Sequence, residues 1–161
     1  MLPVMPWIDT ILEQFQIIDT FTTDESEYYG PYNTLLTDLF PHIEHYQRYT
    51  SFESGTDQQM RDQYENIVGQ NLVVPKLYAI SAMGTRFSVY EYDKETNAVS
   101  PPSISRHPTF MTDVAPASRW NYELLDDVGE QKMRELVLEV KRMCQDIIES
   151  ANPVPVFCAQ Q

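Results

Sequence analysis

The sequence predicts an α+β domain in which a small antiparallel or mixed sheet is built around one central hairpin and flanked by about four helices. The hairpin is indicated by two adjacent runs rich in β-branched and aromatic residues, 76–82 and 86–92, with the turn signal Met83-Gly84-Thr85 between them. Both faces of these runs are largely apolar, so we expect helices to cover both sides of the hairpin.

Four stretches with apolar residues at helical spacing can supply that cover. The helices are expected at 6–18, 31–40, 57–68 and 127–150. Pro6 and Pro31 suit a first helical turn, because proline fixes φ and lacks the N–H that a helix start leaves unused. Gly69 favours a stop after the third helix, and the fourth keeps a 3.6-residue period over more than four turns.

The remaining segments are less regular. Residues 42–55 show weak alternation, which fits either one short strand or a loop. The prolines in 98–102 confine that extended piece to an edge of the sheet. Residues 103–119 have no sustained period and are expected to form a loop that Trp120 and Tyr122 anchor to the core.

Length and composition favour one domain spanning residues 1–161. Its parts are an N-terminal helix with an acidic connector (1–27), a core (28–150) and a tail (151–161). The net charge is −13, and it is uneven: residues 1–75 hold twelve acids and two bases, whereas residues 76–161 hold twelve acids and nine bases. An acidic surface repels phosphate backbones, so we expect no tight nucleic-acid binding unless a metal or a local basic patch assists.

The N-terminus has no basic region before its apolar residues and meets Asp9 early, so a secretory signal is not expected. No run approaches the ~18 apolar residues of a membrane span. Cys144 and Cys158 do not form a disulfide framework. The sequence therefore predicts a cytoplasmic or nuclear protein that is neither secreted nor in the membrane.

Four runs of the chain resemble segments that occur in the same order in a known family: EYYGPYNTLLTDLFP, TDQQMRDQYENIV, LVVPKLYAISAMGTRFSVYEYD and TDVAPASRWNYELLDDVGEQKMRELVLEVKRM. They resemble a large, mostly uncharacterised family of fungal, chiefly basidiomycete, proteins that is similar to the PD-(D/E)XK, or restriction-endonuclease-like, superfamily. The SAMGTRF turn and the DVAP–RW segment are the most specific blocks.

The resemblance implies a helix, a three-strand meander carrying Asp and then Glu-x-Lys, and a second helix. In such a site two carboxylates hold Mg²⁺, which lowers the pKa of a bound water. The helices at 31–40 and 57–68 would match, but only about sixteen residues separate them, and three strands with turns need roughly twenty-five to thirty. No Glu-x-Lys triplet occurs there, so the segment with the catalytic residues is expected to be missing.

Weak candidates for chemistry remain. Glu44, Glu53 and Asp57 are the nearest carboxylates for a non-standard nuclease site. His42, Glu44 and His45 could hold zinc or manganese, but two histidines at this spacing are a weak signal and no further ligand of matched spacing is visible. Exposed or interfacial histidines are therefore the stronger interpretation.

Four polar residues are candidates for binding. Gln59, Arg61 and Lys76 lie on or near the helix that offers polar groups to the site in this superfamily. For Gln59 and Arg61, ordinary solvent-facing helix positions are the stronger interpretation. Arg86, together with the amides of the hairpin turn, could meet an anion. A glycine in such a turn more often supplies only a positive φ.

Three hypotheses follow. The first is a catalytically inactive, shortened nuclease-like fold that acts as a binding or regulatory module and needs no cofactor. Loss of the meander would leave an exposed sheet edge, which a homo-oligomer or a full-length paralogue would cover. The second is a Mg²⁺-dependent nuclease or phosphodiesterase with unusual carboxylates. The third is an accessory small-molecule enzyme on a borrowed scaffold.

Overall fold

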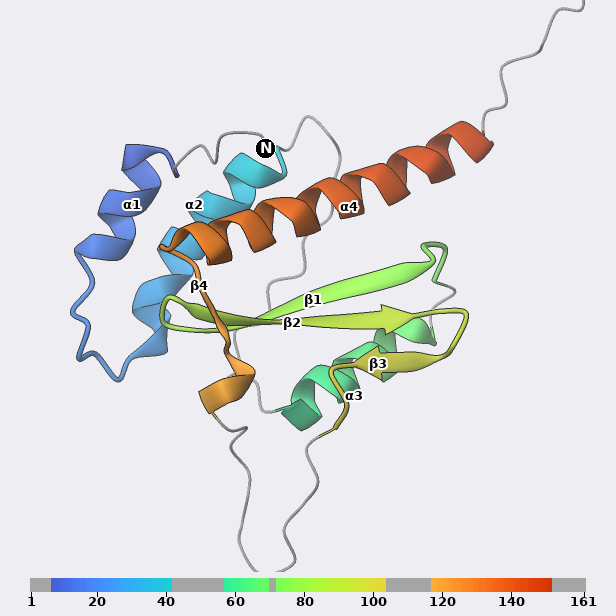
Figure 1. The fold of residues 1–161 in the computed structure, drawn as a ribbon, viewed down its shortest axis with the longest axis horizontal. Helices are drawn as coiled ribbons and strands as arrows, with labels where there is room; N and C mark the ends of the chain where they lie inside the picture. The colour runs from blue at the N-terminus through green and yellow to red at the C-terminus, as the bar shows by residue number, and fades with distance from the viewer. Residues whose placement is uncertain (1–6, 42–56, 70–71, 104–116, 152–161) are drawn as a thin grey trace, which may run out of the picture.

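The computed structural model describes residues 7–41, 57–69, 72–103 and 117–151, which form an α+β fold (Figure 1). The α-helices in these residues are α1 (Asp9–Gln16), α2 (Tyr29–Leu39), α3 (Asp57–Val68) and α4 (Asp127–Ala151). The strands are β1 (Lys76–Met83), β2 (Arg86–Asp93), β3 (Ala98–Ser100) and β4 (Tyr122–Glu123). Short 3₁₀ helices are η1 (Glu25–Tyr28) and η3 (Ala117–Arg119). The predicted class, with four helices and a small antiparallel sheet, is confirmed.

Strand β2 is the centre of the sheet. β1 pairs with its whole length, from Lys76 opposite Asp93 to Met83 opposite Arg86. On the other side, β3 pairs with the last part of β2 and β4 with its beginning, and all these pairs are antiparallel. Each hairpin strand is one residue longer than expected. Gly84 adopts φ of 60°, so Gly84-Thr85 alone suffices for the turn.

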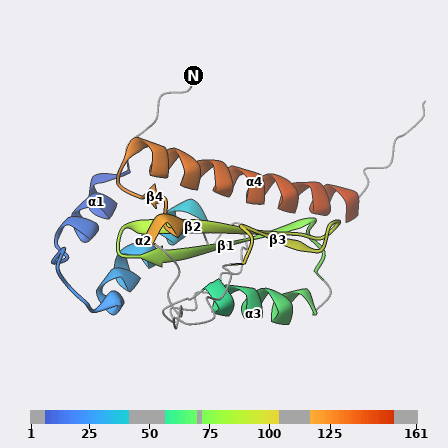
Figure 2. The ribbon, with the colours of Figure 1, turned by 60° about the horizontal axis from the view of Figure 1, so that its bottom comes forward.

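The expectation of a hairpin covered on both faces is confirmed (Figure 2): α4 lies on one side of the sheet and α3 on the other. Side chains of successive strand residues point to opposite faces, and two core clusters result. One joins Phe87 to α1, α2 and α4; the other joins Tyr90 and Tyr92 to α3. This division agrees with the alternation along Arg86–Tyr92, in which Phe87 has the opposite parity to Tyr90 and Tyr92.

The cluster under α4 is organised by Trp7 and β4. The indole Nε1 of Trp7 donates a hydrogen bond of 2.9 Å to the carbonyl of Leu124, while the guanidinium of Arg134 lies 4.4 Å from the Trp7 ring centroid. Tyr122 of β4 stacks on Phe87 with ring centroids 5.3 Å apart. Buried Trp7, just before α1, thus connects this part of the chain to the start of α4.

Some expected boundaries were wrong. Helix α1 begins at Asp9 and ends at Gln16 rather than Ile18. The acidic connector is not entirely irregular, because the Asp24 carboxylate accepts a hydrogen bond from the Ser26 N–H and caps η1. The piece expected at 98–102 is a strand only over Ala98–Ser100. Strand β4 and helix η3 were not expected at all.

Anchoring by Trp120 and Tyr122 is supported by burial and contacts: Trp120 is buried, and Tyr122 packs on the core.

Three of the segments with sequence-based expectations lie outside the described residues: the short strand or loop weighed for 42–55, the loop at 104–116 and the tail at 152–161. None of the helices in the described ranges has the length and apolar content that crossing a membrane requires.

Candidate functional site

Asp57, a weak catalytic candidate from the sequence, is at the centre of a buried polar cluster between α3 and β2. Its carboxylate accepts hydrogen bonds from Arg61 Nε at 3.0 Å and from the Tyr90 hydroxyl at 3.1 Å. Arg119 Nη2 approaches Asp57 Oδ1 to 4.0 Å. The carboxylate side chain is only 10% exposed, so it is enclosed by donors and does not project into solvent.

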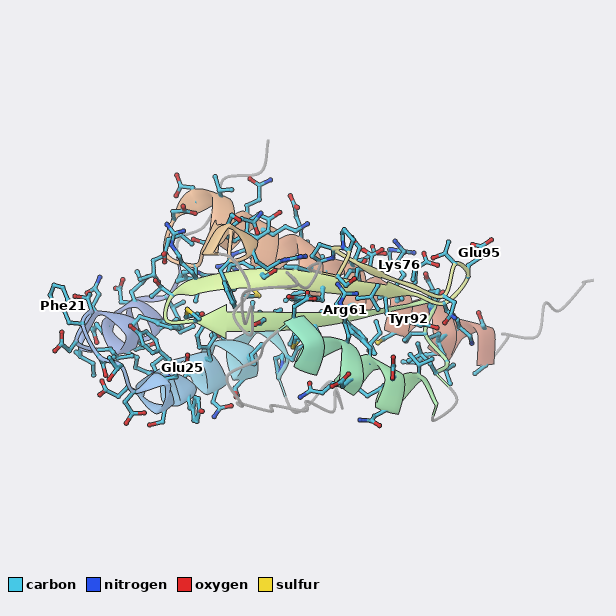
Figure 3. The ribbon with its side chains drawn as sticks, turned by 90° about the horizontal axis from the view of Figure 1, so that it is seen from below. Phe21, Glu25, Arg61, Lys76, Tyr92 and Glu95 are labelled. Atoms are coloured by element: carbon cyan, nitrogen blue, oxygen red, sulfur yellow. The ribbon has the colours of Figure 1, made fainter. Side chains whose placement is uncertain are left out.

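The two arginines of this cluster also bind main-chain carbonyls that follow β3. Arg61 Nη2 donates to the carbonyl of Pro101, and Arg119 Nη2 donates to that of Pro102 at 3.0 Å. The guanidinium groups of Arg61 and Arg119 therefore hold α3, η3 and the end of β3 together. Figure 3 shows Arg61 beside the sheet, where α3 packs on it. The sequence singled out Asp57 and Arg61 but missed Arg119 and Tyr90 as their partners.

Tyrosine hydroxyls complete the contact between α3 and the sheet. Tyr64 donates to the carbonyl of Tyr90 at 2.8 Å. Burial raises the pKa of Tyr64 and, on the other face, that of Tyr32. Burial, followed by the charge of Asp57, raises the pKa of Tyr90 to about 12. These groups are held neutral in the folded protein.

The raised pKa of Tyr90 predicts alkaline sensitivity. A tyrosine in the unfolded chain titrates near 10. The stabilisation linked to the neutral form is therefore complete below about pH 10 and is lost as the pH rises toward about 12. We expect the free energy of unfolding in urea to fall over this range, and Tyr90→Phe to lessen the slope. Equal slopes for wild type and Tyr90→Phe would contradict the assignment.

The other binding candidates are separated from this cluster. Lys76 Nζ forms an ion pair with Glu91 Oε1 at 2.7 Å across the hairpin. The hydrogen bond and charge of Glu91 raise the pKa of Lys76. Gln59 lies on α3, but its side chain is outside the described part of the structure. The structure therefore does not bring Arg61, Lys76 and Arg86 together in one site.

Arg86 lines a hollow at the hairpin turn with a volume of about 510 Å³. Its walls come from α1, η1, the turn and the chain around β4; they include Phe15, Tyr28, Leu125 and Glu123. The Arg86 side chain is 63% exposed, and its Nε lies 4.0 Å from Glu123 Oε2. The Tyr32 hydroxyl donates to the Gly84 carbonyl at 2.9 Å and fixes the turn. An anion at Arg86 would also meet the negative charge of Glu123.

Ser81 and Ser88 flank the hairpin turn and are both buried. Trp120 Nε1 donates to the Ser81 hydroxyl at 3.3 Å, which ties the chain after η3 to β1. The metal candidates His42, Glu44 and His45, and the carboxylate Glu53, lie outside the described residues. Within the described residues, no group of three His, Cys, Asp or Glu side chains is arranged to hold a metal ion.

The outer side of β1 is the longest unpaired edge of the described sheet. No described strand pairs with that side, although β1 is eight residues long. Residues Lys76 to Ile80 are half-buried, and Ala82 and Met83 are exposed; in β2, by contrast, Phe87, Ser88, Tyr90 and Tyr92 are buried. An edge of this kind presents a row of backbone donors and acceptors that can bind another strand.

Comparison with family models, with curated proteins and with solved structures gives no match for this chain.

Proposed function

We propose that this protein is a catalytically inactive, nuclease-like fold that acts as an interaction module, and that the outer edge of β1 is its docking element. The observation that carries the proposal is the eight-residue β1, unpaired on its outer side within the described sheet while helices cover both faces of that sheet. Strand addition to such an edge is a general mode of protein recognition, since main-chain hydrogen bonds supply affinity.

The environment of Asp57 supports a non-catalytic role for this carboxylate. A metal ligand or general base needs free lone pairs facing a substrate. Asp57 instead accepts from Arg61 and Tyr90 and is paired with Arg119. Replacing Asp57 is therefore expected to lower the stability of the fold rather than to remove a catalytic group. The likeness to restriction-endonuclease-like proteins remains part of the proposal and rests on the sequence blocks alone.

A nuclease assay tests the proposal against the Mg²⁺-dependent alternative. Purified protein is incubated with single- and double-stranded DNA and RNA in the presence of Mg²⁺ or Mn²⁺, and we expect no cleavage above the metal-free control. Cleavage that disappears in Glu53→Ala or Glu44→Ala would overturn the proposal. A contaminating nuclease would leave both variants as active as the wild type.

The third hypothesis, an accessory small-molecule enzyme, finds one supporting feature in the hollow beside Arg86. Its volume of about 510 Å³ falls within the range of small-molecule sites. However, Tyr28 is the only tyrosine in its lining, and the Arg86–Glu123 pair leaves no net charge for orienting a ligand. We therefore favour the interaction module.

A further inference from the structure

We propose that the partner strand at β1 is β1 of a second copy of this chain, paired antiparallel so that Lys76 lies opposite Ala82 and Tyr78 opposite Ile80. This inference rests on the proposed function, because it names the occupant of the same edge. The resulting interface is isologous: both copies use the same strand around a two-fold axis perpendicular to the sheet.

The direction of the backbone groups follows from the hairpin. The Lys94 N–H donates to the Pro75 carbonyl at 2.9 Å, so position 75 faces the β2 side. Hydrogen-bonding direction alternates along a strand. The odd-numbered residues of β1 therefore bond to β2, and the residues whose N–H and C=O groups face outward are Lys76, Tyr78, Ile80 and Ala82.

The residues of β1 themselves carry little of the protection that is usual in an edge strand. Natural edges are blunted by proline, bulges or charged side chains within the strand. The register of β1 with β2 is unbroken over all eight residues, and β1 contains no proline. Its one charged residue, Lys76, lies at its first position and is paired with Glu91. No strand of the described residues pairs with the centre of β1 on its outer side.

The register follows from symmetry. Across a two-fold axis perpendicular to the sheet, paired residues share a face, so their numbers must sum to an even value. When the residue numbers of each pair add up to 158, every outward-facing residue of β1 has a partner within the other β1. Lys76 then lies opposite Ala82 and Tyr78 opposite Ile80, and the two-fold axis repeats each pair. With two hydrogen bonds in each pair, up to about eight bonds form. Neighbouring registers leave at least one outward-facing residue without a partner inside β1.

The charge distribution favours a second copy in this orientation. Residues 9–39, which contain α1, η1 and α2, carry seven acids and no base. They lie at the turn end of the hairpin, and Figure 3 shows Phe21 and Glu25 at the opposite end of the molecule from Lys76. Antiparallel pairing places the acid-rich ends of the two copies far apart. It also separates the two Lys76 side chains, and each meets an uncharged alanine.

A pair of charge variants at Ala82 tests the register. Lysine at 82 would face Lys76 of the second copy twice per dimer, whereas glutamate would face the same lysine with opposite charge. We expect the wild type to show dimers by light scattering and analytical ultracentrifugation at physiological ionic strength. Ala82→Lys should weaken dimerisation about tenfold relative to Ala82→Glu. Adding Lys76→Glu to Ala82→Lys should restore it.

Hydrogen exchange gives a second readout that does not depend on substitution. The amides of Tyr78, Ile80 and Ala82 should gain protection as protein concentration rises, while those of Ala79 and Ser81 should be protected throughout. A monomer at all concentrations up to about 0.1 mM would overturn the inference, as would a dimer equally stable in both charge variants. Neither result requires nuclease activity, so failure here is distinguishable from failure of the proposed function.

Discussion

Replacing Gly129 with alanine is expected to destabilise the fold by about 3 kcal/mol or more, the upper range for an overpacked interior. Gly129 is buried in the first turn of α4. A Cβ at this position would lie 1.7 Å from the carbonyl oxygen of Glu123 and 2.4 Å from its carbonyl carbon. These are backbone atoms of β4, and the hydrogen bond from Leu124 N to Thr85 O, at 2.9 Å, holds this part of the chain against the hairpin. Neither side can move without breaking contacts.

Urea unfolding followed by circular dichroism measures this effect, and Gly30 supplies the matched control. Gly30 lies in α2, and an added Cβ there would meet nothing within 4 Å. Gly30→Ala should therefore leave stability unchanged or raise it by up to ~1 kcal/mol through helix propensity. Equal stability of Gly129→Ala and wild type would mean that α4 and β4 do not approach as closely as described.

Replacing Asp57 with alanine is expected to cost about 3–5 kcal/mol, as when one partner of a buried ion pair is removed. The change would leave Arg61 and Arg119 with side chains only 16% and 14% exposed and no carboxylate between them. It would also remove the acceptor of the Tyr90 hydroxyl and an acidic residue from the first turn of α3. The contact between α3 and the sheet should weaken most.

Glu65→Gln, an exposed change on the same helix, should alter the free energy of unfolding by no more than ~0.5 kcal/mol. Both variants are measured by chemical denaturation at neutral pH. A stability of Asp57→Ala equal to that of Glu65→Gln would remove the argument that Asp57 is structural. It would also reopen the interpretation of Asp57 as a carboxylate reserved for chemistry, because catalytic carboxylates are often retained at a cost in stability.

Several features could be predicted because they depend on local patterns. The alternation in Arg86–Tyr92 assigns Phe87 to one face and Tyr90 to the other, whatever packs on them. The 3.6-residue period of α4 extends over enough turns to fix its type, and the expected bounds 127–150 differ from the observed Asp127–Ala151 by one residue. Strand β4 could not be found in this way: its two residues, Tyr122 and Glu123, are too few for any period, and it exists because the chain meets β2 there.

The buried polar cluster around Asp57 could be predicted from the sequence only in part. Asp57 and Arg61 are four residues apart on one helix, so their contact is local and follows from helical spacing. Arg119 reaches the same carboxylate from a segment that is distant in sequence, and Tyr90 reaches it from β2. No local signal connects these residues, because their proximity depends on how α3 and η3 pack around the sheet.

The sequence by itself determined the hairpin, its two apolar faces and the helices that must cover them, since side-chain periodicity and turn chemistry are local properties. Only the tertiary structure decided which hairpin strand is central and which is left at the margin. That choice depends on the two short strands, β3 and β4, which both add to β2. Their pairing buries β2 and leaves the outer backbone groups of β1 without a described partner strand, and the proposed role of the protein depends on that asymmetry.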